Sequence, residues 1–294
     1  MTPDLSLAAA AELLGREVVS CEPKAGGENS PVHQVRLAGQ AEPVIVKQYQ
    51  KRLQRAKEVH VCRLLADNGI DRVPRVLAAG EYHVVLTLMP GRPLGEVSDG
   101  LDEAARFAVY RQLGEFLARL HQIKLDAFGY LVTRIVDPKP DNTAYMTGWF
   151  DAELARFGEQ GGDRELAAAM ARYVAERAGL LAGCPGAVLC HNDFHEGNVL
   201  IDEGGELTGV IDMENAVAAD PLTDIAKTDC YSIRGDRAKW DGLVAGYGSA
   251  ALARAEVLPL YRLSHALQLS NWFAQIGRTD ALAGLADDMR QILT

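Results

Sequence analysis

The most informative stretch of the sequence runs from residue 191 to 201 and reads HNDFHEGNVLI. It joins a polar loop, 191–198, to a β-like run, and a second β-like run at 207–211 leads directly into the acidic segment DMEN, 212–215. Short runs of β-branched and other apolar residues between turn signals indicate strands. We therefore expect Asp193 and Asn198 on one loop, and Asp212 at the end of a strand.

The rest of the chain changes character near the turn Pro90-Gly91. Before it, β-like runs at 32–37, 44–47 and 82–89 surround one helical pattern, 51–68. After it, helical periodicity dominates, most clearly at 101–121 and from Pro221 onward. We expect an α+β protein whose strand-rich part spans 1–90 and whose larger, mainly helical part spans 91–294.

These polar residues have the chemical types that phosphoryl transfer from a nucleotide requires. That reaction needs a carboxylate facing the acceptor hydroxyl, oxygen ligands for Mg²⁺ and a cation on the phosphates. Asp193 can supply the first, Asn198 and Asp212 the second, and Lys47, at the end of a β-like run, the third. We expect these side chains to converge on one site.

At these residues the chain resembles the aminoglycoside phosphotransferase family, small-molecule kinases with a protein-kinase-like fold. The family signature HGDxHxxN…xIDxxxxxxxDPxxD is matched by HNDFHEGN…VIDMENAVAADPLTD, and the likeness runs from about Ala25 through Asp224. The resemblance implies a two-lobed fold. A small antiparallel-sheet lobe, 1–90, would bind the nucleotide, and a larger helical lobe, 91–294, would carry the catalytic loop and the acceptor pocket.

The resemblance also implies a role for each matched side chain. Asp193 is the expected catalytic residue, which orients the attacking hydroxyl, and Asn198 and Asp212 are the expected Mg²⁺ ligands. Lys47 would contact the α- and β-phosphates. Glu58 would hold Lys47 in place, although Glu28 and Glu81 are other carboxylates in the same region.

Further nucleotide contacts are implied at two backbone segments. The turn 26–30 resembles the phosphate-covering loop of the family, which makes Gly27, Asn29 and Ser30 candidates. The backbone around Leu88 falls where adenine would hydrogen-bond. Asn192 replaces the usual glycine of the signature, and we expect the loop to survive because asparagine tolerates left-handed geometry.

The acceptor is open among the aminoglycosides, other antibiotics, choline, homoserine and sugars that the family phosphorylates. Residues 91–294 hold 19 Lys/Arg and 30 Asp/Glu, a net charge of −11, against +1 for residues 1–90. This acidity favours a cationic acceptor by electrostatic steering. Candidate carboxylates for its ammonium groups are Glu196, Glu214, Asp229, Asp236 and Asp241; aromatic candidates for stacking are Trp149, Tyr231, Trp240 and Trp272.

The predicted function is therefore that of an ATP- or GTP-dependent O-phosphotransferase that moves the γ-phosphate to a hydroxyl of a small, cationic molecule such as an aminoglycoside-type antibiotic. Two alternatives are a housekeeping kinase for choline, homoserine or a sugar, and a catalytically inactive nucleotide-binding protein. A zinc hydrolase built on His191, Asp193 and His195 is a third, but the other five histidines show no paired spacing.

Composition bears on partners and compartment. A net charge of −10 disfavours nucleic acid and anionic membranes, and no apolar run reaches membrane-spanning length. Five scattered cysteines without a CxxC pair are typical of reduced thiols. We expect a cytoplasmic monomer or dimer whose partners are the nucleotide and the acceptor.

Overall fold

The computed structural model describes residues 11–24 and 30–294. They divide into two compact units, each assembled from separate stretches of chain. Unit 1 comprises the chain up to residue 101 together with 131–136 and 196–216, and unit 2 comprises 102–130, 137–195 and 217–294. The assignment of nucleotide and acceptor roles to 1–90 and 91–294 stays a prediction.

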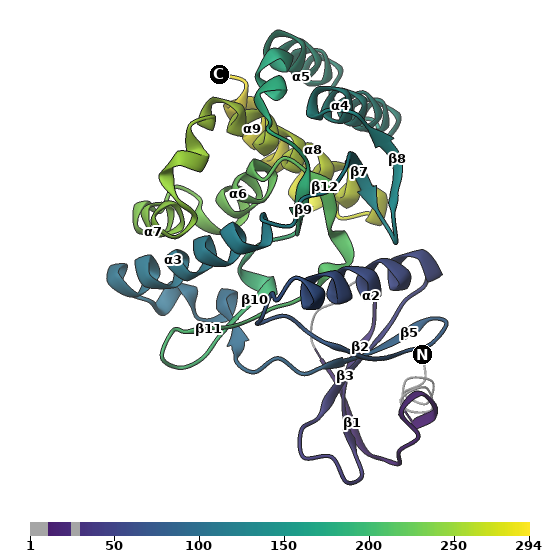
Figure 1. Cartoon of the computed structure of the whole chain (residues 1–294). Coiled ribbons are helices and arrows are strands. Elements are labelled where there is room, and N and C mark those ends of the chain that lie inside the picture. The colour runs from purple at the N-terminus through teal and green to yellow at the C-terminus, as the bar shows by residue number, and fades with distance from the viewer. Residues whose placement is uncertain (1–10, 25–29) are drawn as a thin grey trace. The chain divides into compact units, whose positions relative to one another are not determined.

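Unit 1 is built on a five-stranded antiparallel sheet in the order β1-β2-β3-β5-β4, which Figure 1 shows beside helix α2. Its elements are β1 (Val18–Pro23), β2 (Val32–Leu37), β3 (Val44–Gln48), α2 (Arg52–Asp67), β4 (Val76–Ala79) and β5 (His83–Thr87). Lys47 of β3 stands opposite Val32 on one side and Val84 on the other, so it lies in the middle of the sheet.

Side chains of β3 alternate between the two faces of the sheet, as they do in any strand. Val44 and Val46 pack with Val35 and Val85 on one face. Ile45 packs on the other face in a cluster that includes Val59 of α2. Since Lys47 is two residues from Ile45, its side chain belongs to the face that α2 covers.

A second, three-stranded sheet completes unit 1, in the order β11-β10-β6. Its strands are β6 (Arg92–Pro93), β10 (Val199–Ile201) and β11 (Leu207–Val210), with the short helices η1 (Leu94–Glu96), η2 (Ser98–Gly100), η4 (Glu196–Asn198) and η5 (Met213–Asn215) around them. The turn into β6 requires Gly91, which has a φ of 104° and where a Cβ would overlap the backbone oxygen of Ile201.

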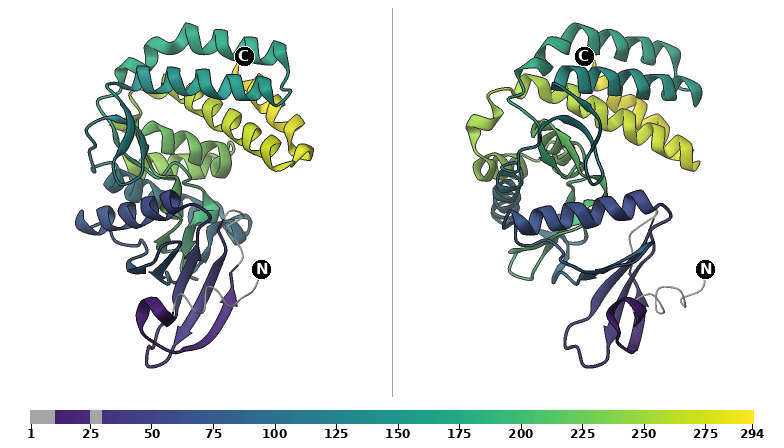
Figure 2. Two further views of the ribbon diagram at one scale, coloured as in Figure 1. Left: turned by 90° about the vertical axis from the view of Figure 1, so that its right-hand side faces the viewer. Right: turned by 45° about the vertical axis from the view of Figure 1, so that its right-hand side comes forward.

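Unit 2 is mainly helical and includes most of a four-stranded sheet in the order β8-β7-β12-β9. The strands are β7 (Phe128–Leu131), β8 (Ile135–Lys139), β9 (Val188–Cys190) and β12 (Val217–Ala219). The helices are α3 (Glu103–Leu120), α4 (Asn142–Glu159), α5 (Arg164–Arg177), η3 (Ala178–Gly183), α6 (Leu222–Thr228), η6 (Asp229–Ile233), α7 (Arg237–Tyr247), η7 (Ser249–Leu252), η8 (Ala255–Val257), α8 (Leu258–Ile276), η9 (Thr279–Ala281) and α9 (Leu282–Ile292). Figure 2 shows α4 and α5 side by side.

Helices α3 and α7 approach so closely that their contact depends on glycine. A Cβ on Gly114 of α3 would overlap the backbone oxygen of Leu243, and a Cβ on Gly246 of α7 would overlap that of Arg111. Backbone atoms cannot move aside as a flexible side chain can, so an added methyl group must push the two helices apart.

Gly246→Ala is therefore expected to lower the free energy of unfolding by about 3 kcal/mol, measured by chemical denaturation. The matched control is Gly284→Ala in α9, where a Cβ would meet nothing within 4 Å. That variant should be stabilised by about 0.5 to 1 kcal/mol, because alanine restricts the unfolded chain more than glycine does. Equal effects of the two substitutions would contradict the close packing of α3 on α7.

The sequence predicted these elements unevenly. The strands at 32–37, 44–47 and 82–89 and the helices at 51–68 and 101–121 are confirmed to within a few residues. Strands β4, β6, β7, β8 and β12 were not predicted. Helix α4 begins at Asn142, where the side chain of Asp141 caps it. None of the described helices is both long enough and apolar enough to cross a membrane.

Candidate functional site

Unit 1 contains a buried cluster in which one lysine faces three carboxylates. The Lys47 ammonium lies 3.0 Å from Glu58 Oε2, 2.6 Å from Asp212 Oδ1 and 2.9 Å from Glu214 Oε2. We call these four residues the Lys47 cluster. β3 contributes the lysine, α2 contributes Glu58, and the segment after β11 contributes Asp212 and Glu214, so three separate elements meet there.

The structure shows which of the three glutamates considered from the sequence pairs with Lys47. Glu58 is 1% exposed on the face of α2 that covers the sheet. Glu81 is exposed and pairs with Arg52 instead, and Glu28 lies outside the described residues. Of the three candidates from the sequence, the structure therefore brings Glu58 to Lys47.

The pKa of the Lys47 ammonium reflects competition between burial and charge. Burial alone would lower its pKa, but the negative charges of Glu58, Asp212 and Glu214 outweigh burial and raise it well above the usual lysine value. Lys47 therefore stays protonated and provides a fixed positive charge.

A second buried lysine borders this cluster and was not singled out from the sequence. Lys57 of α2 is fully buried, and burial lowers its pKa to about 7, an effect that the negative charge of Glu214 opposes. Glu214 was a candidate acceptor residue, but its carboxylate lies against Lys47, where it belongs to the charge balance of this cluster. A lysine in a predicted helix is normally expected to be exposed to solvent, so nothing in the sequence indicated that Lys57 is buried.

Asn198 and Asp212 lie at the same end of the β10-β11 hairpin. Val199 pairs with Val210, and the Ile211 N–H donates to the Asn198 backbone oxygen at 2.9 Å. Asp212 adopts left-handed geometry, with φ 67° and ψ 64°, which turns the chain directly after the strand. Its side chain is 29% exposed, against 2% for Glu58 and 10% for Glu214, so Asp212 is the member of the cluster most open to a ligand.

Unit 2 contains the loop with the predicted catalytic aspartate. Asp193 Oδ1 lies 3.3 Å from the Lys227 ammonium and 3.7 Å from His195 Nε2. We call these three residues the Asp193 cluster. Burial would raise the pKa of Asp193, but the contact with His195 and the charge of Lys227 outweigh burial and hold it well below the usual aspartate value. Asp193 is thus an ionised carboxylate, and Lys227 is a neighbour that the sequence did not reveal.

Asp224 of α6 holds the Asp193 loop in place through hydrogen bonds to its backbone. The backbone N–H groups of His191 and Asn192 donate to the Asp224 carboxylate at 2.8 and 2.7 Å. Asn192 has a φ of 61°, the left-handed geometry that the usual glycine would allow. Phe194 is fully buried and stacks on Phe116, which anchors the loop next to Asp193.

The zinc alternative finds no support in the described part of the chain. The two groups of side chains there that lie close enough to share a metal ion are Glu58, Asp212 and Glu214, and His121, Cys190 and Asp224. His191, Asp193 and His195 form no such group.

Several predicted nucleotide contacts are located only in part. Gly27 and Asn29 lie outside the described residues. Ser30, just beyond them, is 1% exposed, and its hydroxyl has no hydrogen-bond partner among the described residues. Leu88 follows β5 directly and is half-buried. Their roles stay predictions.

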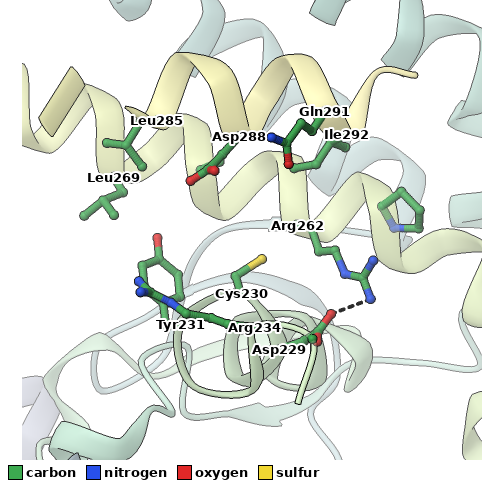
Figure 3. Close-up of a pocket in the computed structure, with 13 residues that line it drawn as sticks. Asp229, Cys230, Tyr231, Arg234, Arg262, Leu269, Leu285, Asp288, Gln291 and Ile292 are labelled. Carbon is green, nitrogen blue, oxygen red and sulfur yellow. Dashed lines mark ion pairs between the residues drawn. The ribbon is translucent and has the colours of Figure 1, made fainter. Parts of the chain in front are cut away.

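The acceptor candidates are divided between the two units: Glu196 and Glu214 belong to unit 1, and Asp229, Asp236 and Asp241 belong to unit 2. The Ser98 hydroxyl donates to Glu196 Oε1 at 2.6 Å, and Asp236 caps α7 and pairs with Arg106. Asp229, by contrast, lines a cavity of about 780 Å³ in unit 2, which Figure 3 shows between η6 and helices α8 and α9. Tyr231, one of the aromatic candidates, lines the same cavity.

The fold thus combines an antiparallel-sheet unit, which contains the Lys47 cluster, with a helical unit, which contains the Asp193 cluster. The sequence model of the phosphotransferase enzyme family, APH, matches residues 20–262. The chain belongs to this family and is an enzyme of the small-molecule kinase class. The resemblance drawn from the signature is confirmed.

Solved structures confirm the fold. Aminoglycoside phosphotransferase APH(4)-Ia, in a ternary complex with ADP and hygromycin B, is 19% identical with a TM-score of 0.76, over 98% of this chain and 97% of that one. APH(2")-IIa, in a complex with streptomycin and ATP, is 16% identical with a TM-score of 0.71, over 98% and 99%. A proposed fructosamine-3-kinase from Thermobifida fusca is 20% identical with a TM-score of 0.73, over 99% and 100%.

Proposed function

We propose that this enzyme transfers the γ-phosphate of ATP, or of GTP, to a hydroxyl of a small molecule that carries an amino group. The observation that carries the proposal is the buried Lys47 cluster, in which a fixed ammonium and an accessible carboxylate lie at the end of a hairpin. Complexes of similar structures with ADP and with ATP support a nucleotide as the phosphate donor.

The residues of unit 1 fit Mg²⁺. Carboxylate and amide oxygens are the ligands that this ion uses in phosphoryl-transfer sites. The oxygens of Glu58, Asp212 and Glu214 lie within 4.8 Å of one another, and Asn198 stands at the same hairpin end as Asp212. Asn198 and Asp212 would hold the ion, because Glu58 and Glu214 are nearly buried against Lys47. When bound, Mg²⁺ neutralises charge on the transferred phosphate.

The protein side chains then have distinct tasks. Lys47 stabilises negative charge on the α- and β-phosphates, and Glu58 holds it in place. Asp193 accepts a hydrogen bond from the acceptor hydroxyl and orients it for attack. Because its pKa is held low, Asp193 is a carboxylate at neutral pH and is ready to accept that bond.

Two acceptor classes remain in view, each with its own support. The net charge of −11 over residues 91–294 and the aminoglycoside complexes of similar structures favour an aminoglycoside-type antibiotic, which would make the role resistance. The cavity in unit 2 favours an amino-bearing metabolite, because two aspartates and two arginines line it and their formal charges cancel.

The proposal predicts that the nucleoside diphosphate forms only when a nucleotide, Mg²⁺ and a suitable acceptor are all present. A coupled assay would measure release of ADP from ATP, or of GDP from GTP, with aminoglycosides, homoserine, choline, sugars and sugar amines. Chelation of Mg²⁺ by EDTA should stop release, and excess Mg²⁺ should restore it. Nucleotide binding by calorimetry without turnover of any acceptor would instead indicate an inactive nucleotide-binding protein.

A further inference from the structure

The cavity of unit 2 lies next to the Asp193 cluster. Tyr231 lines the cavity, and the Lys227 ammonium sits 4.5 Å from the centre of its ring. The same ammonium lies 3.3 Å from Asp193 Oδ1. Tyr231 and Lys227 therefore connect the lining of the cavity to the Asp193 cluster. At about 780 Å³, the cavity has the size typical of a small-molecule site.

Two of the four charged side chains that line this cavity are already paired with each other, and the other two are not in an ion pair among the described residues. Asp229 of η6 and Arg262 of α8 form an ion pair across it, drawn as a dashed line in Figure 3. Arg234 and Asp288 also line the cavity, and no ion pair occupies either of them among the residues that the structure describes. One guanidinium and one carboxylate therefore remain for a ligand.

These two groups come from different walls. Asp288 projects from α9, whereas Arg234 belongs to the turn after η6, as Figure 3 shows. Arg234 has a φ of 48°, and the preceding element η6 is a π-helical turn. Both features are uncommon, cost backbone energy and concentrate at functional sites. The strained turn presents the arginine at the cavity.

From this arrangement we infer that the acceptor of this enzyme is a zwitterion, with an ammonium group bound by Asp288 and an acidic group bound by Arg234. The inference rests on the proposed function, since it takes the ligand of the cavity to be the acceptor. Leu269, Leu285 and Ile292 supply an apolar lining, so the ligand also carries an aliphatic part. An amino acid joined to a hydroxylated or sugar moiety has this chemistry.

A polycation fits the same cavity poorly. Because Asp229 is already paired with Arg262, Asp288 is the one lining carboxylate left for an ammonium group. A second ammonium group would meet Arg234, and like charges repel. The acidity of residues 91–294 as a whole attracts cations to the surface, but the lining of the cavity decides which ligand stays.

The test is direct binding to the full chain, measured by isothermal titration without nucleotide. The probes are fructosyl-leucine and homoserine, which are hydroxylated zwitterions, the carboxamide of fructosyl-leucine, which lacks the carboxylate, and 2-deoxystreptamine, which carries ammonium groups only. We expect fructosyl-leucine to bind about tenfold more tightly than its carboxamide, and 2-deoxystreptamine to bind most weakly.

Two variants separate the contributions of the charged groups. Arg234→Gln should weaken fructosyl-leucine about tenfold and leave its carboxamide unchanged, whereas Asp288→Asn should weaken both by about the same factor. Arg237→Gln and Asp287→Asn are matched controls, because both residues are exposed and neither lines the cavity. They should leave all affinities unchanged.

Three results would overturn the inference. They are tightest binding by 2-deoxystreptamine, an equal loss of affinity for fructosyl-leucine and for its carboxamide in Arg234→Gln, and no binding by either zwitterion. An ADP-release assay with the same compounds distinguishes this failure from failure of the proposed function. Turnover of 2-deoxystreptamine alone would reject the zwitterion and leave phosphotransfer intact. The predicted binding pattern without ADP release from any compound would reject phosphotransfer and leave the charge recognition of the cavity intact.

Discussion

Replacing Asp193 by asparagine is expected to lower kcat by about two to four orders of magnitude, the usual contribution of a positioned acid or base. The change removes the negative charge that orients the acceptor hydroxyl and keeps the size of the side chain. Nucleotide affinity should stay within about twofold, because the proposed nucleotide contacts are other residues, and a loss in kcat alone marks an interaction made in the transition state.

The measurements are ADP release under saturating acceptor, nucleotide affinity by calorimetry and thermal unfolding followed by circular dichroism. Asp126→Asn is the matched control, since Asp126 is an exposed aspartate of the same unit. Its kinetics should match those of the unchanged enzyme. Turnover of Asp193→Asn within about threefold of that level would remove Asp193 from the mechanism.

Lys47→Met is expected to combine loss of activity with loss of stability. Without the ammonium, the carboxylates of Glu58, Asp212 and Glu214 face one another with no compensating charge at their centre. Removing one partner of a buried ion pair costs about 3 to 5 kcal/mol. The loss of the cation on the phosphates should lower kcat/KM by about 100- to 1000-fold, as for other preorganised electrostatic contacts.

A double variant separates these two effects. Lys47→Met combined with Glu58→Gln removes one of the uncompensated charges, so it should recover part of the unfolding free energy without restoring activity. Lys51→Met is the control, because Lys51 is an exposed lysine just outside α2. Denaturant titration and initial rates measure both. Full activity in Lys47→Met, or unchanged stability, would show that the Lys47 cluster does not work as proposed.

Local pattern was sufficient to predict the elements that carry the site. Val44–Gln48 and the β10-β11 hairpin have the β-branched composition of strands, and helical spacing places Glu58 near Val61, Cys62 and Leu65 on the buried side of α2. Strands β4 and β12 were missed because they are short and half or more of their residues are alanine, which is not typical of strands, whereas the equally short β10 reads VLI.

Local pattern could not identify the partners of the charged groups. Lys57 and Lys227 looked like ordinary helical lysines, although one is fully buried beside the Lys47 cluster and the other pairs with Asp193. Glu214 and Asp229 were grouped as acceptor residues because both are acidic. The structure places the first against Lys47 and the second in an ion pair with Arg262 that spans the cavity.

The sequence by itself determined the family, the order of strands and helices around the motif, and the residue types available for phosphoryl transfer. These follow from spacing, because a period of two or 3.6 residues sets which side chains share a face. The tertiary structure decided which charged groups meet. Lys47 contacts Asp212, 165 residues away in the sequence. Two aspartates and two arginines come together to line one cavity. Such pairings depend on distances in space, which the separation of residues along a chain does not encode.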